Sequence, residues 1–281
     1  MFFNRKNYHF EIANVLIYNF LEREKMLSVD EIRSYWEDRA SGDSSAQSTT
    51  QDVYLREIEL RVLIENILRL KPERVVDIGC GDGRTTIGVA RHLPEHNFFG
   101  IDYSNAMIEN ARQNLNEHCV SNVIFQSHDI RDPLADSFDL AYTTRCLINL
   151  PDRELQILAL RNIYQALRVG GHYLMIENFR EGHEKFNQVR KNFGLSEIAI
   201  RDHNLFFSRD QLLSDIEDFF VVKEEVNISS AYYLMTRVVY SRICADSGVQ
   251  PDYFNEQHRY ASELPFSGEF GPVRLLILQK K

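Results

Sequence analysis

The stretch Val75-Val76-Asp77-Ile78-Gly79-Cys80-Gly81-Asp82-Gly83 decides the fold of this chain. Its apolar first half is typical of a buried parallel strand. Its three alternating glycines predict a turn before a helix that begins at Arg84. A glycine turn at a helix N-terminus lets a ligand approach bare backbone. The stretch therefore predicts a cradle for a nucleotide-type cofactor.

The spacing of the glycines narrows the kind of cofactor. A dinucleotide fingerprint reads G-x-G-x-x-G. Here the glycines stand at 79, 81 and 83, and Arg84 occupies the place of the third glycine of that fingerprint. A P-loop needs G-x-x-x-x-G-K-[ST], and the sequence contains neither Gly-Lys-Ser nor Gly-Lys-Thr. Neither a dinucleotide cradle nor a P-loop is expected.

The stretch resembles the first motif of the class I S-adenosylmethionine (SAM) methyltransferases, and the resemblance continues in order from about residue 55 to about 177. Four further segments carry it: Phe98-Phe99-Gly100-Ile101-Asp102-Tyr103-Ser104, Ile124-Phe125-Gln126-Ser127-His128-Asp129-Ile130, Phe138-Asp139-Leu140-Ala141-Tyr142-Thr143 and Leu167-Arg168-Val169-Gly170-Gly171-His172-Tyr173-Leu174. The resemblance implies an α/β fold with a seven-stranded, mostly parallel, doubly wound sheet whose last strand is antiparallel. It implies SAM as cofactor and S-adenosylhomocysteine as product.

The resemblance also implies which residues bind the cofactor. Asp102 is the expected ribose-binding acid and Asp129 the expected adenine-contacting acid, and a carboxylate at a strand end can accept both hydroxyls of a ribose. The alternative for either acid is a helix cap or a turn. Arg56 is a candidate for the cofactor carboxylate, with ordinary helix packing as its alternative. The predicted cofactor set is Asp77, Gly79, Cys80, Gly81, Gly83, Asp102, Tyr103, Met107, Asp129, Ile130, Thr144 and Arg56.

Composition limits the partners of the chain. It has 281 residues, a hydrophobic fraction of 44% and a net charge of -9. This charge disfavours nonspecific binding to nucleic acid or an anionic membrane. Polar residues interrupt the first twenty positions, so neither a signal peptide nor a spanning helix is expected. The four cysteines form no C-x-x-C pair, which favours a reduced, cytoplasmic setting without structural zinc.

Residues 1–51 are expected to form an N-terminal helical cap. Apolar residues recur at helical spacing over 8–26. The capping box Ser28-Val29-Asp30-Glu31 opens a second helix that runs through Trp36. The Gly/Ser/Thr-rich stretch 41–50 predicts a mobile loop. These helices are candidates to dock on the sheet or on a second copy, and a homodimer is an open possibility.

Residues 52–281 are expected to form the SAM-binding domain. The core alternates strands and helices, including a helix over 52–69 and a long helix over 152–168 that Gly170-Gly171 would end. A sixth strand is expected over 219–226 and a seventh over 274–278. Two insertions, at about 179–217 and 228–271, are expected to cover the strand ends and form the acceptor pocket.

Three residues are candidates for catalysis: Arg145, Glu177 and His203. Arg145 follows the fourth strand and is a candidate contact for an acidic substrate or for the cofactor carboxylate, with a structural ion pair as the alternative. Glu177 and Asn178 end the fifth strand and are expected to face the cleft. His203 lies in an irregular aromatic segment and is the candidate general base, because its ordinary pKa lies near neutrality. An ordinary surface role is its alternative.

The acceptor is less well defined. We expect a small molecule or a glycan, with O-methylation favoured. N-methylation of a small amine or amino sugar, an aminopropyl transferase and a non-catalytic SAM-binding regulatory subunit are the alternatives. The acids Asp129, Asp132, Asp136 and Asp139 are read as a solvated loop, and no metal site is expected.

Overall fold

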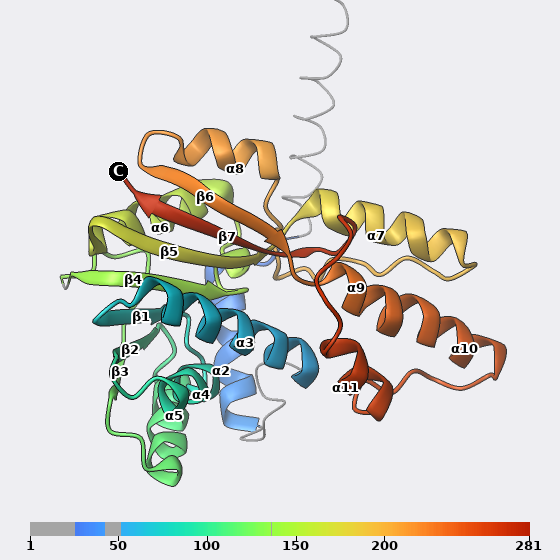
Figure 1. Ribbon diagram of the computed structural model, residues 1–281, viewed down its shortest axis with the longest axis horizontal. Helices are drawn as coiled ribbons and strands as arrows, with labels where there is room; N and C mark the ends of the chain where they lie inside the picture. Colours follow the sequence, from blue (N-terminus) through green and yellow to red (C-terminus); the bar gives the residue numbers. More distant parts are fainter. Residues whose placement is uncertain (1–25, 43–51, 136) are drawn as a thin grey trace, which may run out of the picture.

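The computed structural model describes residues 26–42, 52–135 and 137–281. Its centre is one sheet with the strand order β3-β2-β1-β4-β5-β7-β6 (Figure 1). β7 pairs antiparallel with both neighbours, and every other pairing is parallel. The strands are β1 (Arg74–Ile78), β2 (Asn97–Asp102), β3 (Val123–Ser127), β4 (Phe138–Thr144), β5 (Leu167–Asn178), β6 (Phe220–Asn227) and β7 (Val273–Lys280). The predicted seven-stranded α/β fold is confirmed.

Helices cover both faces of the sheet because successive residues of a strand point to opposite sides. Val75 packs with α3 (Val53–Leu70), α4 (Arg84–His92) and α5 (Asn105–His118). Its neighbour Val76 packs with α6 (Arg153–Ala166) and α8 (Arg209–Ile216). The continuous apolar run at the start of the glycine motif therefore serves two cores at once.

Short polar caps fix where several helices begin. The side chains of Asp52, Ser104 and Asp152 accept a hydrogen bond from the backbone N–H three residues on, at the starts of α3, α5 and α6. The predicted capping box is present, since Ser28 N–H donates to Glu31 Oε2 at 2.8 Å and Glu31 N–H to Ser28 Oγ at 3.3 Å. It opens α2 (Val29–Gly42), which continues past Trp36. The helix predicted over 8–26 and most of the loop predicted over 41–50 lie outside the described residues.

The predicted end of the long helix was wrong. α6 ends at Ala166, and β5 begins at the next residue, so that Gly170 and Gly171 lie inside the strand. Gly170 has a φ of 77°, and a Cβ on Gly171 would lie 2.9 Å from the Arg168 carbonyl oxygen. The β4–β5 register shifts between Phe138 and Leu140. The two glycines therefore accommodate an irregular strand pairing rather than stop a helix.

The chain between β5 and β7 builds a lobe beyond the carboxyl ends of the parallel strands (Figure 1). It comprises α7 (Arg180–Asn192), α9 (Ser230–Tyr233), the π-helix η2 (Leu234–Val239), α10 (Tyr240–Asp246) and α11 (Glu256–Ser262).

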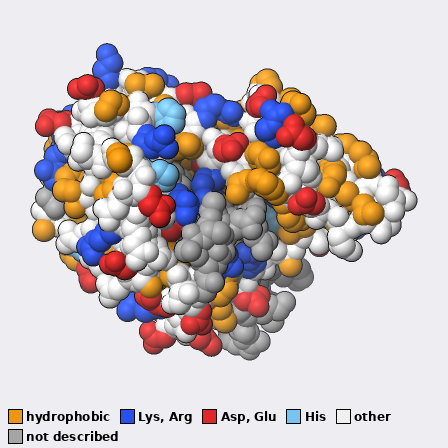
Figure 2. All heavy atoms as spheres, turned by 90° about the horizontal axis from the view of Figure 1, so that it is seen from below, with side chains coloured by type: hydrophobic (Ala, Val, Ile, Leu, Met, Phe, Trp, Pro, Cys, Tyr) orange, Lys and Arg blue, Asp and Glu red, His pale blue; other side chains and the backbone are white. Residues whose placement is uncertain are grey.

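Figure 2 shows basic and acidic side chains interspersed on one face of the molecule. In the part of the chain that the structure describes, no helix is both long and apolar enough to cross a membrane.

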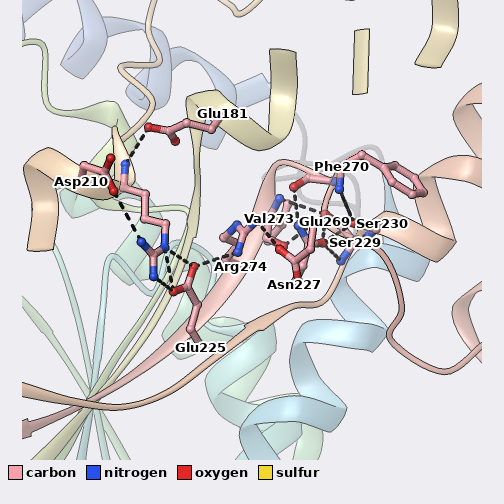
Figure 3. A network of polar contacts seen from close by, with 12 residues as sticks. Glu181, Asp210, Glu225, Asn227, Ser229, Ser230, Glu269, Phe270, Val273 and Arg274 are labelled. Carbon is pink, nitrogen blue, oxygen red and sulfur yellow. Dashed lines mark hydrogen bonds and ion pairs between the residues drawn. The ribbon is translucent and has the colours of Figure 1, made fainter. Parts of the chain in front are cut away.

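A polar network anchors this lobe where β6 ends and β7 begins (Figure 3). Asn227 Oδ1 accepts the N–H groups of Ser229 and Ser230 at 3.1 and 3.0 Å. Glu225 binds Arg274 at 2.8 Å and also Arg209, at the start of α8. Both insertions are therefore tied to the same sheet edge, which fixes the lobe relative to the strand ends.

Candidate functional site

A cavity of about 400 Å³ lies at the carboxyl ends of the parallel strands, where open α/β sheets bind ligands. The turn after β1, the end of β2 and the end of β4 form its floor. The segment 198–206 and the lobe cover it. Its volume falls within the roughly 300–1,000 Å³ of typical small-molecule sites.

The glycine turn is shaped by close contacts. Gly79 has a φ of 74°, and a Cβ there would lie 2.2 Å from Cys146 Sγ. Gly81 has a φ of 54°, and its N–H donates to Asp102 Oδ2 at 3.0 Å. Gly79, Cys80 and Gly81 line the cavity. Gly83 does not line it, because it packs against Phe125, whose ring a Cβ would meet at 2.6 Å.

Asp102 stands at the cavity beside this turn. Its Oδ1 accepts the N–H of Ser104 at 2.9 Å, and burial raises the pKa of its carboxyl to about 6. Tyr103 and Met107 line the same end, and the Tyr103 hydroxyl is buried without a partner among the described residues. A buried polar atom without a partner is costly. A carboxylate, an unpaired hydroxyl and open backbone therefore fit a ribose-bearing ligand.

Three other predicted cofactor residues do not reach the cavity. Asp77 is buried under the turn, where Thr86 Oγ1 donates to it at 2.6 Å and burial raises its pKa to about 7. Asp129 is bound by Arg131 at 2.6 Å and by Arg33 of α2 at 3.3 Å. Burial opposes ionisation of Asp129, but the hydrogen bonds from Arg131 hold its pKa below the ordinary value. Ile130 is buried in the core on the α6 side of the sheet.

Arg145 lines the cavity directly after β4. Its Nε and Nη2 donate to Glu59 of α3 at 2.7 and 3.0 Å, so the guanidinium is held in a bidentate ion pair. Its φ of 54° is unusual for a non-glycine residue, and such backbone is often found at functional sites. Arg56 and Thr144, both predicted cofactor residues, line the same cavity.

Glu177 was expected to face the cleft, but its carboxylate points elsewhere. Oε1 accepts the N–H groups of Cys146 and Leu147 at 3.1 and 2.9 Å, and Oε2 accepts that of Ile148 at 3.4 Å. The side chain is fully buried, and burial raises its pKa to about 7. Glu177 thus caps the short 3-10 helix η1 (Leu147–Asn149) and does not line the cavity.

His203 lies in the cavity roof. Its ring stacks on Tyr35 of α2 with centroids 4.6 Å apart, and it meets the Trp36 ring edge-on with centroids 6.0 Å apart. Burial lowers its pKa below the ordinary value, which leaves the imidazole neutral at pH 7. A backbone hydrogen bond also joins the segment before α2 to the cavity roof, since Leu27 N–H donates to the Asp202 carbonyl oxygen at 3.1 Å.

Several lining residues were not predicted as site residues. Asp52 and Glu59 of α3 reach the cavity seven residues apart, and Tyr233 and Arg237 reach it from the lobe. Asn149 Oδ1 and Asn178 Oδ1 are buried without partners among the described residues. The spacing of Asp52, Arg56 and Glu59, which places them on one face of a helix, was the sequence signal that could have identified Asp52 and Glu59 as lining residues. Asn178 lines the cavity as expected.

Comparison with known proteins assigns the family. A family model described as a methyltransferase domain matches residues 70–224, more than half of the chain. The chain belongs to the methyltransferase domain family. The predicted class of protein, a class I SAM-dependent methyltransferase, agrees with this assignment, which supports SAM as its cofactor.

Individual relatives of this methyltransferase are distant. A malonyl-[acyl-carrier protein] O-methyltransferase from Bacillus cereus is 28% identical over 184 residues, which cover 62% of this chain and 63% of that protein. A trans-aconitate 2-methyltransferase from Deinococcus radiodurans is 38% identical over 106 residues, which cover 36% and 38%. The matches therefore span less than two thirds of the length of these curated relatives.

A solved structure shares the fold. The magnesium protoporphyrin IX methyltransferase from Synechocystis PCC 6803 with bound S-adenosylhomocysteine has a TM-score of 0.59 and 15% identity. The alignment covers 90% of this chain and all of that one. At this identity the likeness concerns the fold alone.

Among the residues that the structure describes, no group of three or more His, Cys, Asp and Glu side chains is placed to hold a metal ion.

Proposed function

We propose that this methyltransferase transfers the methyl group of SAM to an oxygen atom of a small organic acceptor. One observation carries the proposal: a single cavity is lined both by the glycine turn with Asp102 and by His203 with the lobe. A donor site and an acceptor site that share one cavity allow in-line transfer between them. O-methyltransferases among the relatives favour oxygen as the methylated atom.

The residues of the glycine turn and of the end of β2 suit the donor. Asp102 would bind the ribose hydroxyls, and the open backbone of Gly79 and Gly81 would lie against the ligand. Arg56, which lines the cavity from α3, would hold the methionine carboxylate. When bound, SAM supplies an electrophilic methyl group, so that the protein needs to contribute position, exclusion of water and a proton acceptor.

His203 is the candidate proton acceptor for a hydroxyl nucleophile. It lines the cavity from the roof, and its lowered pKa keeps the imidazole in the neutral form that a base requires. Stacking on Tyr35 orients its ring. Arg145 would fix the shape of the floor between donor and acceptor through its pair with Glu59. Glu177 would act indirectly, by holding the backbone turn that follows Arg145.

Methyl transfer can be tested before the acceptor is known. The protein is incubated with SAM carrying a 13C-labelled methyl group and a small-molecule extract of cells, and products are located by mass spectrometry and 13C NMR. We expect a protein-dependent product whose labelled carbon has the chemical shift of a methoxy group. A labelled N-methyl product would contradict O-methylation. S-adenosylhomocysteine binding without any labelled product would favour a non-catalytic, regulatory role.

A further inference from the structure

We propose that Arg237 and Tyr233 form a carboxylate-binding subsite on the acceptor side of the cavity, so that the acceptor is an organic acid with an apolar body. This inference rests on the proposed methyl transfer, because it concerns the second substrate of the same cavity. Both residues come from the part of the lobe between β6 and β7, and both line the cavity.

The guanidinium of Arg237 is fixed in place. Its Nη2 donates to Asp52 at the start of α3, and its Nη1 donates to His258 Nε2 at 2.9 Å. The ring centroid of Tyr253 lies 3.9 Å from its central carbon. Although only 8% of the residue is exposed, it lines the cavity. A planar donor group held rigid by its neighbours is suited to recognise a carboxylate.

The backbone that carries Arg237 is itself unusual. Arg237 lies in the π-helix η2, which interrupts the helical run from Ser230 to Asp246. Isolated π turns occur frequently at functional sites. The irregularity is stabilised locally, since Thr236 Oγ1 donates to the carbonyl oxygen of Tyr232 at 2.7 Å. Tyr232 in turn donates its hydroxyl to Asp52 at 2.6 Å, which joins the π-helix to the partner of Arg237.

Tyr233 supplies a second donor beside the guanidinium. Its ring lies 5.5 Å from Arg237, and it lines the same cavity. No hydrogen bond joins its hydroxyl to another residue in the described part of the chain. Burial raises the pKa of Tyr233 to about 12, so the hydroxyl keeps its proton at neutral pH. A protonated phenol next to a guanidinium offers a carboxylate a second hydrogen bond.

Charged side chains of both signs surround this subsite. Arg237 pairs with Asp52 and Arg145 with Glu59, and the cavity is lined further by Arg56, Arg201, Asp82 and Asp102. His258 adds no charge, because it accepts from Arg237 and burial lowers its pKa to about 4. SAM would bring a net positive charge of its own through its sulfonium. In a poorly solvated cavity this positive charge on SAM would attract an anionic acceptor.

Apolar side chains also line the cavity, beside polar ones such as Asn149, Asn178 and His203. Ring and aliphatic side chains from α7 and the roof line it: Phe186, Ile198, Ile200 and Phe206. Only a few polar groups are needed to orient a ligand in such a pocket. A carboxylic acid with an aromatic or aliphatic body therefore matches the two donors and these apolar side chains.

The test compares acids with their amides on the protein saturated with S-adenosylhomocysteine. The probes are benzoate, trans-cinnamate and octanoate, with benzamide, cinnamamide and octanamide as neutral counterparts, followed by thermal shift and calorimetry. We expect at least one acid to raise the melting temperature and to bind about tenfold tighter than its amide. The subsite is overturned if no acid shifts the melting temperature, or if the amides act equally well.

Variants distinguish recognition of the acid by Arg237 from a general effect of the protein's charge. Because Arg237→Gln alone would remove the ion-pair partner of the buried Asp52 carboxylate, the informative variant is Asp52→Asn/Arg237→Gln, which removes both charges and leaves the net charge unchanged. We expect it to lose the preference for acids while S-adenosylhomocysteine still binds, and Tyr233→Phe to weaken acid binding. Arg259→Gln, on the exposed side of α11, is the matched control. Retention of the acid preference in the double variant would show that Arg237 is only structural. If the wild-type protein does not bind S-adenosylhomocysteine, the proposed function itself is contradicted.

Discussion

The sulfur of Cys146 occupies the space that a side chain at Gly79 would need, since a Cβ built on Gly79 falls 2.2 Å from Cys146 Sγ. This contact joins the turn after β1 to the turn after β4, two segments that both line the cavity. It explains why glycine is required here by space as well as by its φ of 74°.

Gly79→Ala is therefore expected to be much more harmful than the same change at another left-handed glycine. Gly248 has a similar φ of 69° but nothing within 4 Å of its Cβ position. We expect Gly248→Ala to lower the free energy of unfolding by about 1 kcal/mol. Gly79→Ala should lower it by roughly 2–5 kcal/mol and also weaken S-adenosylhomocysteine binding. Urea denaturation of the two variants measures the difference, and equal losses would refute the steric account.

Asp102→Ala should weaken S-adenosylhomocysteine binding by about 1–3 kcal/mol, because the ribose would lose hydrogen bonds to a buried acceptor. Asp132→Ala, an exposed acid in the loop after β3, is the matched control and should leave the affinity unchanged. Calorimetric titration gives both values. An unchanged affinity in Asp102→Ala would reject the assignment of this carboxylate to the ribose.

Glu177 should influence stability in a defined pH range. Burial raises its native pKa to about 7, whereas the unfolded value is near 4.3. Between these values the native carboxyl keeps a proton that the unfolded one has lost, so the free energy of unfolding falls as pH rises. The fall should be on the order of 4 kcal/mol.

Glu177→Gln removes this titration and keeps an oxygen for the N–H groups of Cys146 and Leu147. Its free energy of unfolding should depend less on pH between about 4.5 and 7 than that of the wild type. Other buried acids, such as Asp77, titrate equally in both proteins and cancel in the comparison. Parallel pH profiles for the two proteins would contradict the raised pKa of Glu177.

His203→Phe keeps an aromatic ring on Tyr35 and removes the nitrogen that would accept a proton. Once an acceptor is identified, we expect kcat to fall at least about 100-fold, as for loss of a general base. The affinity for S-adenosylhomocysteine should stay within about twofold, because His203 lies on the roof rather than at the glycine turn. His118→Ala, on the exposed end of α5, is the control. Full turnover in His203→Phe would remove this residue from the mechanism.

The fold was predictable because its signals are local. The run from Val75 to Gly83 contains a buried strand, a turn and a helix start within nine residues, and the later strands follow in the same order. The end of α6 was mispredicted because Gly170 and Gly171 accommodate the irregular pairing of β5 with β4. The local sequence pattern does not reveal this pairing, because its two strands are separate segments of the chain. Turn glycines and strand-bulge glycines look alike in sequence.

Site residues were predictable where their place at the end of a strand puts them at the cavity. Asp102 and the glycines at 79 and 81 reach the cavity, as their places at strand ends indicate. Glu177 has a comparable place at a strand end, but the backbone N–H groups of η1 take its carboxylate. Arg237 was missed because its partners Asp52 and His258 lie 185 and 21 residues away in sequence. Long-range pairing of charges leaves no local pattern.

The most direct test of the account is a calorimetric titration of the wild-type protein with S-adenosylhomocysteine, repeated with Asp102→Ala. We predict saturable one-to-one binding below millimolar ligand for the wild type, and clearly weaker binding for the variant. Absence of any binding heat at millimolar S-adenosylhomocysteine across several temperatures, with the protein folded, would contradict the central claim that the cavity beside Gly79 and Asp102 is a methyl-donor site.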